Sequence, residues 1–199
     1  PELRPLFEAV ELLDIKLREW DADTQRLRHQ AETDELTNLL NRRAFQMLGE
    51  SWLEGTWPDR ETFLILLDID HFKSINDRYG HAMGDQVLVM VAAALQAHIR
   101  SDDLAGRIGG EEFAVLIRAQ DQDTALALAQ RLRKGIEEIL ILGSDGERIP
   151  VTASFGVAAN KHFTWRQLMA KADVALYAAK QAGRNCVRVA EQGNTTISA

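Results

Sequence analysis

Two groups of acidic residues are the parts of this sequence best suited to chemistry. Glu111 and Glu112 follow two glycines in the run RIGGEEF, and Asp68 and Asp70 end a long apolar run. Carboxylates gathered in one place repel one another unless a cation compensates their charge. Hard oxygen ligands without neighbouring Cys or His pairs favour Mg²⁺ or Mn²⁺, and Mg²⁺ usually shares its coordination shell with substrate phosphates. The acids therefore indicate phosphoryl chemistry.

A β-hairpin is expected to carry the first group. Residues 104–108 and 113–117 are short and rich in branched apolar side chains. Gly109 and Gly110 between them predict a two-residue turn, because glycine adopts φ > 0 without steric cost. Alone, the pattern equally fits a turn whose acidic residues are merely solvated.

A buried strand is expected to carry the second group. The apolar run at 62–70 is typical of a strand whose last residues emerge at the end of a sheet. Asp68 and Asp70 would share a face if strand geometry persists to residue 70. A hairpin beside this strand would bring Glu111 near Asp68.

Five motifs resemble those of the GGDEF family of diguanylate cyclases. In chain order they are DELTNLLNRR at 34–43, DIDHFKSIND at 68–77, GHAMGD at 80–85, GGEEF at 109–113 and YAAKQAGRN at 177–185. Strands alternating with helices, plus an antiparallel hairpin, predict an α+β fold with a sheet flanked by helices. The resemblance sharpens this expectation to the palm-like fold of nucleotide cyclases and polymerases, which has a ferredoxin-like core. It implies a symmetric homodimer that condenses two GTP into cyclic di-GMP and releases two pyrophosphates.

The resemblance also implies which residues bind metal and act in catalysis. Asp68, the Ile69 carbonyl and Glu111 match the family's metal positions. Glu112 matches the other hairpin acid, close to the metal or to the attacking hydroxyl. Mg²⁺ or Mn²⁺ would neutralise the triphosphate and lower the pKa of the 3′-hydroxyl. Asp70 is expected to have a structural role.

Guanine selection is assigned by resemblance to Asn76 and Asp85. A carboxylate accepts hydrogen bonds from guanine N1–H and the 2-amino group, whereas adenine offers neither donor. Taken alone, Asn76 would be a turn residue and Asp85 a helix N-cap. By the same resemblance, Gly109 and Gly110 let the backbone approach the nucleotide where a Cβ would clash.

Phosphate binding is assigned by resemblance to cationic and backbone groups. Lys180 and Arg184 are four residues apart and would share one helix face, where alone they would be solvated surface cations. The family uses them for the β and γ phosphates. Lys73 and the backbone N–H groups of Phe72 and Lys73 are expected to assist.

Residues 100–103 resemble the family's RxxD product-inhibition motif. A motif this short carries weight only because it stands at the expected distance before GGEEF. Arg100 would bind a phosphate of cyclic di-GMP or stack on guanine, and Asp103 would accept from the guanine edge. Without the resemblance, the two residues would be an ion-paired helix end.

Residues 1–33 are expected to form one long helix with a heptad seam. The segment has no Gly, and nothing after Pro5 breaks a helix. In a parallel dimer, residues at its e and g positions would meet partners of opposite charge. We therefore predict a coiled-coil signalling stalk, with a helix packed on its own domain as the alternative. The seam residues include Leu3, Leu6, Val10, Leu13, Leu17, Trp20 and Leu27.

Length and composition fit one globular domain with an appendage. The 199 residues are 46% hydrophobic, and the net charge of −7 argues against nucleic acid as a partner. No apolar run reaches membrane-spanning length, and the lone Cys186 suits the reducing cytoplasm. The predicted organisation is a stalk at 1–33, a catalytic domain at 34–190 and a tail at 191–199. Because the chain opens without Met, we expect a fragment whose upstream sensor region could be membrane-bound.

Three functional hypotheses remain at this point. The first is a product-inhibited diguanylate cyclase, and the second is a non-catalytic receptor for GTP or cyclic di-GMP that signals to a protein partner. The intact hairpin motif favours the enzyme. An adenylate cyclase or polymerase-like palm is disfavoured by Asp85 and by the lack of a basic groove. Asn38 replaces the usual glycine of the first motif, and Asn tolerates left-handed backbone well.

Overall fold

The computed structural model describes residues 4–55 and 60–191, except for some side chains of the first helix. The predicted tail from residue 192 onward and Leu3 lie outside this part of the chain. The helices are α1 (Arg4–Glu32), α2 (Arg42–Glu54), α3 (Phe72–Tyr79), α4 (His81–His98), α5 (Gln122–Glu137) and α6 (Trp165–Gln181). The strands are β1 (Leu40–Asn41), β2 (Glu61–Ile69), β3 (Leu104–Arg107), β4 (Glu112–Ala119), β5 (Ile141–Leu142), β6 (Arg148–Ile149), β7 (Ala153–Ala159) and β8 (Val187–Val189).

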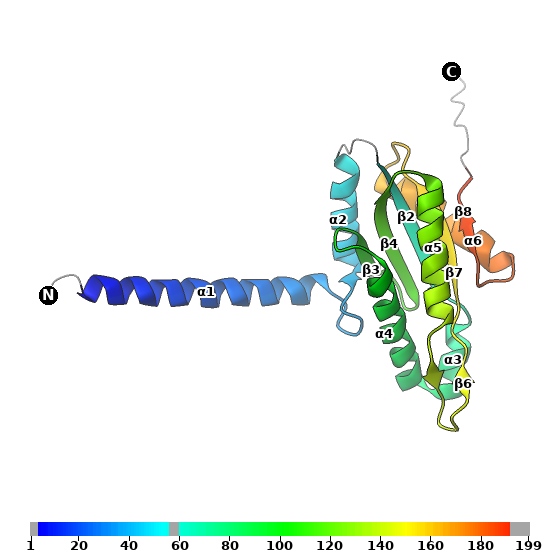
Figure 1. Cartoon of the computed structure of the whole chain (residues 1–199), viewed down its shortest axis with the longest axis horizontal. Helices are drawn as coiled ribbons and strands as arrows, with labels where there is room; N and C mark the ends of the chain where they lie inside the picture. The colour runs from blue at the N-terminus through cyan, green and yellow to red at the C-terminus, as the bar shows by residue number, and fades with distance from the viewer. Residues whose placement is uncertain (1–3, 56–59, 192–199) are drawn as a thin grey trace, which may run out of the picture.

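The main sheet is organised around strand β2. Its strand order is β1-β3-β4-β2-β7-β8, and β2 is antiparallel to both of its neighbours. The strands β7-β2-β4-β3 have the order of a ferredoxin-like core. Figure 1 shows β4, β2 and β7 side by side between the helices. The predicted α+β fold, with a sheet flanked by helices, is confirmed.

Alternate side chains of β2 enter two separate cores, because successive strand residues point to opposite faces. Ile65 and Leu67 pack with residues of α4 and α5 on one face. Leu64 and Leu66 pack with residues of α2 and α6 on the other face. The same alternation places Asp68 at the end of the α6-facing row. Asp68 therefore faces helix α6, whose Lys180 it contacts.

Helix α1 extends away from the domain as a single rod (Figure 1). Its described apolar seam residues are exposed, with Trp20 71% and Leu13 60% accessible to solvent. The alternative in which this stripe packs on its own domain is therefore wrong for the described side chains. A coiled-coil partner for the seam remains a prediction. Leu17 and Leu27 are also exposed.

The two turns singled out in the sequence behave differently. Asn38 has a left-handed φ of 56°, as its residue type predicted, and its N–H donates to the Asp34 carbonyl at 2.9 Å. Gly109 and Gly110 do not have positive φ. The predicted two-residue turn is therefore wrong, because residues 108–111 form a longer connection between β3 and β4.

No helix in the described part of the chain combines the length and the apolar character needed to cross a membrane.

Candidate active site

Asp68 and Glu112 lie opposite each other where strands β2 and β4 meet at one end of the sheet. Directly opposed residues of antiparallel strands have Cβ atoms about 4.5–5.5 Å apart. The Glu111 carbonyl accepts a hydrogen bond from the Ile69 N–H at 3.3 Å. The hairpin therefore lies beside β2, as predicted, and brings Glu111 close to Asp68 in the sheet. The residue directly opposite Asp68 is Glu112.

Lys180 neutralises the Asp68 carboxylate. Its Nζ lies 2.8 Å from Asp68 Oδ2, and the two side chains are only 32% and 12% exposed. Lys180 comes from the last turn of α6, where a cation also complements the helix dipole. Sequence analysis had linked Lys180 to phosphate alone. The ion pair joins residues more than a hundred positions apart, so no local pattern indicated it.

The oxygen-rich sheet end fits a hard divalent cation that brings ligands of its own. In residues 4–55 and 60–191, no three His, Cys, Asp or Glu side chains are grouped to hold a metal ion. The groups available here are the carboxylates of Asp68, Glu111 and Glu112, which are ligands that Mg²⁺ accepts. Mg²⁺ with few protein ligands completes its octahedron with water and phosphate oxygens. The residues therefore suit a metal ion that arrives with a phosphorylated substrate.

Asp70 has the structural role that the sequence predicted. The carboxylate is 5% exposed and accepts hydrogen bonds from Ser154 Oγ at 2.6 Å and Thr152 Oγ1 at 2.8 Å. It also accepts from the backbone N–H of Asn185 at 3.0 Å. These bonds tie the end of β2 to the segment that follows α6. The Asp70 carboxylate is therefore fully engaged in hydrogen bonds that hold the fold together.

Arg107 links the hairpin to the segment after α1. Its guanidinium donates to the Gly110 carbonyl at 2.8 and 3.0 Å and to the Asp34 carboxylate at 3.2 and 3.3 Å. Burial alone would raise the pKa of Asp34, but hydrogen bonds from Thr37 and Arg107 hold it below its usual value. This bridge was missed in the sequence. It fixes the hairpin loop against the base of the stalk.

The two predicted guanine readers lie close together on α3 and α4. A Cβ at Gly84 would overlap the side-chain oxygen of Asn76, so glycine lets α4 approach Asn76 closely. Asp85 follows Gly84 on the exposed side of α4. Helix α4 begins at His81 after the cap residue Gly80, so the alternative reading of Asp85 as an N-cap is wrong. Asn76 and Asp85 therefore flank one helix–helix contact.

Phe72 and Lys73 begin α3 immediately after strand β2. The preceding residue, His71, has a left-handed φ of 55° and turns the chain sharply into the helix. The first N–H groups of a helix lack intrahelical acceptors and favour anions. Phe72 is buried whereas Lys73 is exposed. The helix start therefore presents donors next to the carboxylates, as the assigned phosphate role requires.

Arg184 does not share a helix face with Lys180, so that expectation is wrong. Helix α6 ends at Gln181, and Gly183 and Arg184 have φ values of 104° and 67°. The Arg184 N–H donates to the Ala179 carbonyl at 3.1 Å, and its side chain is exposed. Because Gly183 ends the helix before residue 184, Arg184 does not lie on the helix that carries Lys180.

Arg100 and Asp103 line a cavity of about 320 Å³ at the other end of β4. Three more arginines line it, which the sequence analysis missed because they come from distant segments. We call this cavity the arginine pocket. Its arginines are Arg60, Arg100, Arg118 and Arg131.

Contacts in and around the arginine pocket hold the side chains of Asp103, Arg118 and Arg131 in place. The Arg100 backbone N–H donates to Asp103 Oδ2 at 2.9 Å, while burial raises the pKa of Asp103. The Arg118 guanidinium lies 3.7 Å from the centre of the Trp52 ring, and Arg131 donates to the His98 carbonyl at 2.7 Å. Planar guanidinium groups in a fixed arrangement suit a phosphate-bearing ligand.

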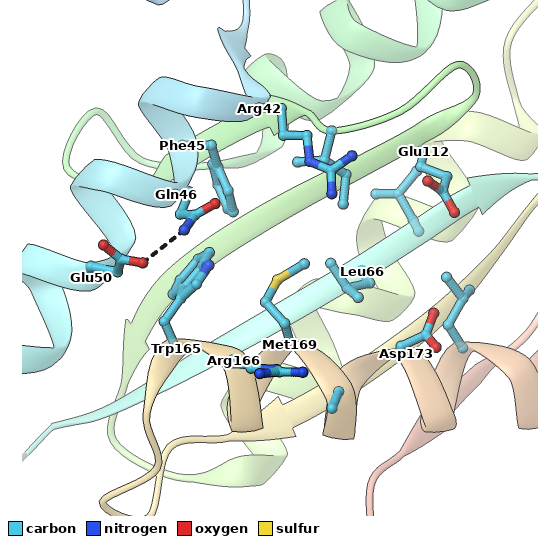
Figure 2. A pocket seen from close by; sticks show the side chains of 14 residues that line it. Arg42, Phe45, Gln46, Glu50, Leu66, Glu112, Trp165, Arg166, Met169 and Asp173 are labelled. Atoms are coloured by element: carbon cyan, nitrogen blue, oxygen red, sulfur yellow. Dashed lines mark hydrogen bonds between the residues drawn. The ribbon is translucent and has the colours of Figure 1, made fainter.

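A groove of about 480 Å³ lies between α2 and α6, and Glu112 is one of the residues that line it. Figure 2 shows Phe45, Trp165 and Met169 around it, with Arg42 directed over the opening. Its floor includes Leu66. No sequence motif had indicated this groove, because its lining comes mainly from α2, α6, β2 and β4, which are far apart in the sequence. Glu112 is therefore accessible from this groove.

Sequence comparisons identify the family. Residues 31–186 match the family described as diguanylate cyclase, GGDEF domain. Diguanylate cyclase A of Treponema denticola is 41% identical over 165 residues, which cover 80% of this chain and 44% of that protein. Diguanylate cyclase DgcM of Escherichia coli is 40% identical over 169 residues, or 83% of this chain and 40% of that protein. The chain thus spans less than half the length of these relatives.

Solved structures give the same assignment. The coiled coil and GGDEF domain of DgcB from Caulobacter crescentus, in complex with c-di-GMP, has a TM-score of 0.83 and 31% identity. The match covers 94% of this chain and all of that one. Diguanylate cyclase SiaD of Pseudomonas aeruginosa, solved with its activator SiaC, has a TM-score of 0.79 and 32% identity over 95% of this chain and 73% of that one. With its hairpin acids, its fold and these relatives in agreement, the chain belongs to the GGDEF family of diguanylate cyclases.

Proposed function

We propose that this chain is a diguanylate cyclase, which condenses two GTP molecules into cyclic di-GMP and releases two pyrophosphates. The observation that carries this proposal is the pair of opposed carboxylates, Asp68 and Glu112, with Lys180 2.8 Å from Asp68. Carboxylates for a metal ion and a cation for phosphates are what a phosphoryl-transfer site needs. Relatives named diguanylate cyclases support the same reaction.

Asp68, the Ile69 carbonyl and Glu111 would hold Mg²⁺ or Mn²⁺ at the end of β2. When bound, the ion would neutralise the triphosphate and lower the pKa of the attacking 3′-hydroxyl. Glu112, opposite Asp68, would lie near the same hydroxyl. Because phosphoryl transfer depends mainly on positioning and electrostatics, the rigid pairing of β2 with β4 supplies much of what catalysis needs.

The nucleotide would span the end of the sheet. Asn76 and Asp85 would read guanine through its N1–H and 2-amino donors. The N–H groups of Phe72 and Lys73, with the Lys73 and Lys180 side chains, would bind the β and γ phosphates. Arg184 would reach the phosphates from the exposed segment after α6. Gly109 would keep the hairpin open, since a Cβ there would collide with the Glu112 carboxylate.

Two copies of the domain would have to face each other, because each 3′-hydroxyl attacks the α-phosphorus of the other nucleotide. The exposed seam of α1, including Leu13 and Trp20, supports a parallel coiled coil that brings two copies together. The matched DgcB structure is described as containing a coiled coil. We propose the stalk as the element that controls how the two domains meet.

The arginine pocket would bind the product and inhibit the enzyme. Arg100 and Asp103 match the inhibitory motif, and the two phosphodiesters of cyclic di-GMP suit several guanidinium groups in one cavity. The pocket opens at the end of β4 away from Glu112. Product bound there would not compete directly for the nucleotide site.

The decisive experiment incubates the purified chain with GTP and Mg²⁺ and follows cyclic di-GMP and pyrophosphate, with Glu111→Ala as the matched control. Product from the parent but not from the variant is the expected result. A parent that binds GTP or cyclic di-GMP without turnover would favour a receptor. Fusing the stalk to a strong parallel coiled coil then distinguishes a receptor from a cyclase whose domains are misaligned, since only the latter should gain activity.

A further inference from the structure

Lys180, which is partly exposed, and the largely buried Asp68 form an ion pair at the centre of the proposed metal site. The Nζ–Oδ2 distance of 2.8 Å is that of a charge-assisted hydrogen bond, and the Asp68 side chain is only 12% exposed. A carboxylate buried to this extent is costly unless an opposite charge compensates it. In the free domain, Lys180 already provides that charge.

The surroundings of Asp68 make this compensation necessary. Glu112 lies directly opposite on β4, and like charges in such a cross-strand pair destabilise a sheet. Glu111 adds a further carboxylate next to them along the hairpin. Asp70 is engaged by hydroxyl and backbone donors, so it requires no share of the Lys180 charge.

We propose that Lys180 is an exchangeable counter-ion, which occupies Asp68 when no nucleotide is bound and transfers to the phosphates when GTP arrives. This inference rests on the proposed cyclase function. A metal ion alone would have to share Asp68 with an ammonium group 2.8 Å away, or displace it without bringing an anion of its own to receive it. A metal ion that enters with GTP supplies phosphate oxygens to receive the displaced ammonium. Metal and nucleotide would therefore bind together rather than separately.

The side chain and its position are suited to such an exchange. A lysine ammonium is a compact charge on a flexible four-carbon stem, so it can change partners without movement of the helix. Lys180 is 32% exposed, and it lines a cavity of about 230 Å³ together with Glu112 and Tyr177. This cavity gives the ammonium room to leave Asp68 on the side where the hairpin acids lie.

The test measures metal binding without turnover. Mn²⁺ is titrated into the nucleotide-free protein, and free Mn²⁺ is followed by electron paramagnetic resonance. Lys180→Met should bind Mn²⁺ about tenfold more tightly than the parent, because a competing cation near the ligand has been removed. Binding of a GTP analogue with a methylene between the α and β phosphorus atoms should weaken about tenfold in the same variant.

Two matched variants separate contact from general charge. Arg184→Met removes a cation that is four residues from Lys180 in the sequence. Among the described residues, the Arg184 side chain makes no contact with Asp68, so Mn²⁺ affinity should change less than about threefold. Lys180→Arg keeps the charge at Asp68 and should leave nucleotide-free Mn²⁺ binding as weak as in the parent. Lys180→Gln repeats the charge removal with a polar side chain, should Lys180→Met fold poorly by circular dichroism.

Equal Mn²⁺ affinity in the parent, Lys180→Met and Lys180→Gln would overturn the inference. An equal gain in Arg184→Met would overturn it as well, because the effect would then be general electrostatics. These outcomes differ from failure of the proposed function. A parent that makes cyclic di-GMP but shows no effect of Lys180 on Mn²⁺ loses only the counter-ion role, whereas a parent that neither binds Mn²⁺ with the analogue nor forms product loses both.

Discussion

Strand β4 joins two regions with opposite electrostatic character. At its first residue, Glu112 lies opposite Asp68, whose charge is compensated by Lys180. Near its other end, Arg118 belongs to a pocket lined by four arginines and Asp103, which suits an anion. Arg118 is six positions further along the strand than Glu112, which is about 20 Å. The two regions are therefore far too distant for one ligand to occupy both.

The difference implies that the two regions would bind their proposed ligands by different chemistry. The acidic end would take up its ligand as a metal–phosphate complex, so its affinity should depend on a divalent ion. The arginine pocket already holds guanidinium groups in place, with Arg118 stacked on Trp52 and Arg131 bonded to a carbonyl, so it should need no metal. Since the regions share β4, binding at one could alter the other only through the packed sheet.

Removing the charge of Asp68 in the acidic region should have the largest effect on cyclase activity. Asp68→Asn should lower cyclase activity about 10²- to 10³-fold, because charge stabilisation at the phosphates is lost. Cyclic di-GMP binding to the arginine pocket should persist, as measured by calorimetry without metal. Glu61→Gln, at the exposed start of the same strand, is the control and should keep full activity. Loss of product binding in Asp68→Asn would show that the two regions are not independent.

Removing an arginine from the arginine pocket should have the next largest effect, on inhibition by cyclic di-GMP. Arg100→Ala should raise the cyclic di-GMP concentration for half-inhibition at least tenfold, because a charged hydrogen-bonding group to phosphate is lost. The initial rate before product accumulates should stay within about twofold of the parent. Arg43→Ala removes an exposed arginine outside the pocket and should change neither quantity. Unchanged inhibition in Arg100→Ala would remove the regulatory role of this region.

A change in the stalk should leave both regions intact and affect only how two copies meet. Leu13→Asp with Leu17→Asp should lower specific activity several-fold in dilute enzyme and little at high concentration, because charges in the seam oppose helix pairing. Activity against protein concentration gives the measurement. Glu19→Ala with Arg26→Ala changes exposed charges on the side of the helix away from the seam and serves as the control. Identical dilution curves for the parent and the seam variant would contradict a role of the stalk in dimerisation.

The bridge from Arg107 to Asp34 should have the smallest effect, on stability rather than chemistry. Asp34→Asn should lower the free energy of unfolding at pH 7 by about 1 kcal/mol. Hydrogen bonds hold the pKa of Asp34 below its usual value in the folded protein. The contribution of Asp34 to stability is therefore complete above the pKa of the unfolded chain, and it disappears as the pH falls through the pKa of the folded protein. Urea titrations at pH 7 and below about pH 4 should therefore show the difference shrinking in acid. A difference that is constant with pH would exclude this ionic contribution.

Local patterns predicted much of the fold. The apolar run before Asp68 became the central strand because its side chains fill two cores, and the branched runs around GGEE became an antiparallel pair. Where the prediction failed, a local rule was overridden. Gly109 and Gly110 avoid positive φ because a longer connection spans 108–111, and Arg184 leaves the helix face of Lys180 because Gly183 ends the helix earlier.

The sequence by itself determined the acids, their strand and hairpin, the heptad seam and the family resemblance, because each depends on neighbouring residues or on motif order. Only the tertiary structure decided that Glu112 faces Asp68, that Lys180 neutralises it and that Arg107 connects the hairpin to Asp34. It also gathered four arginines from separate segments into one cavity. Strand register and long-range ion pairs depend on how whole elements pack, and no local pattern contains that information.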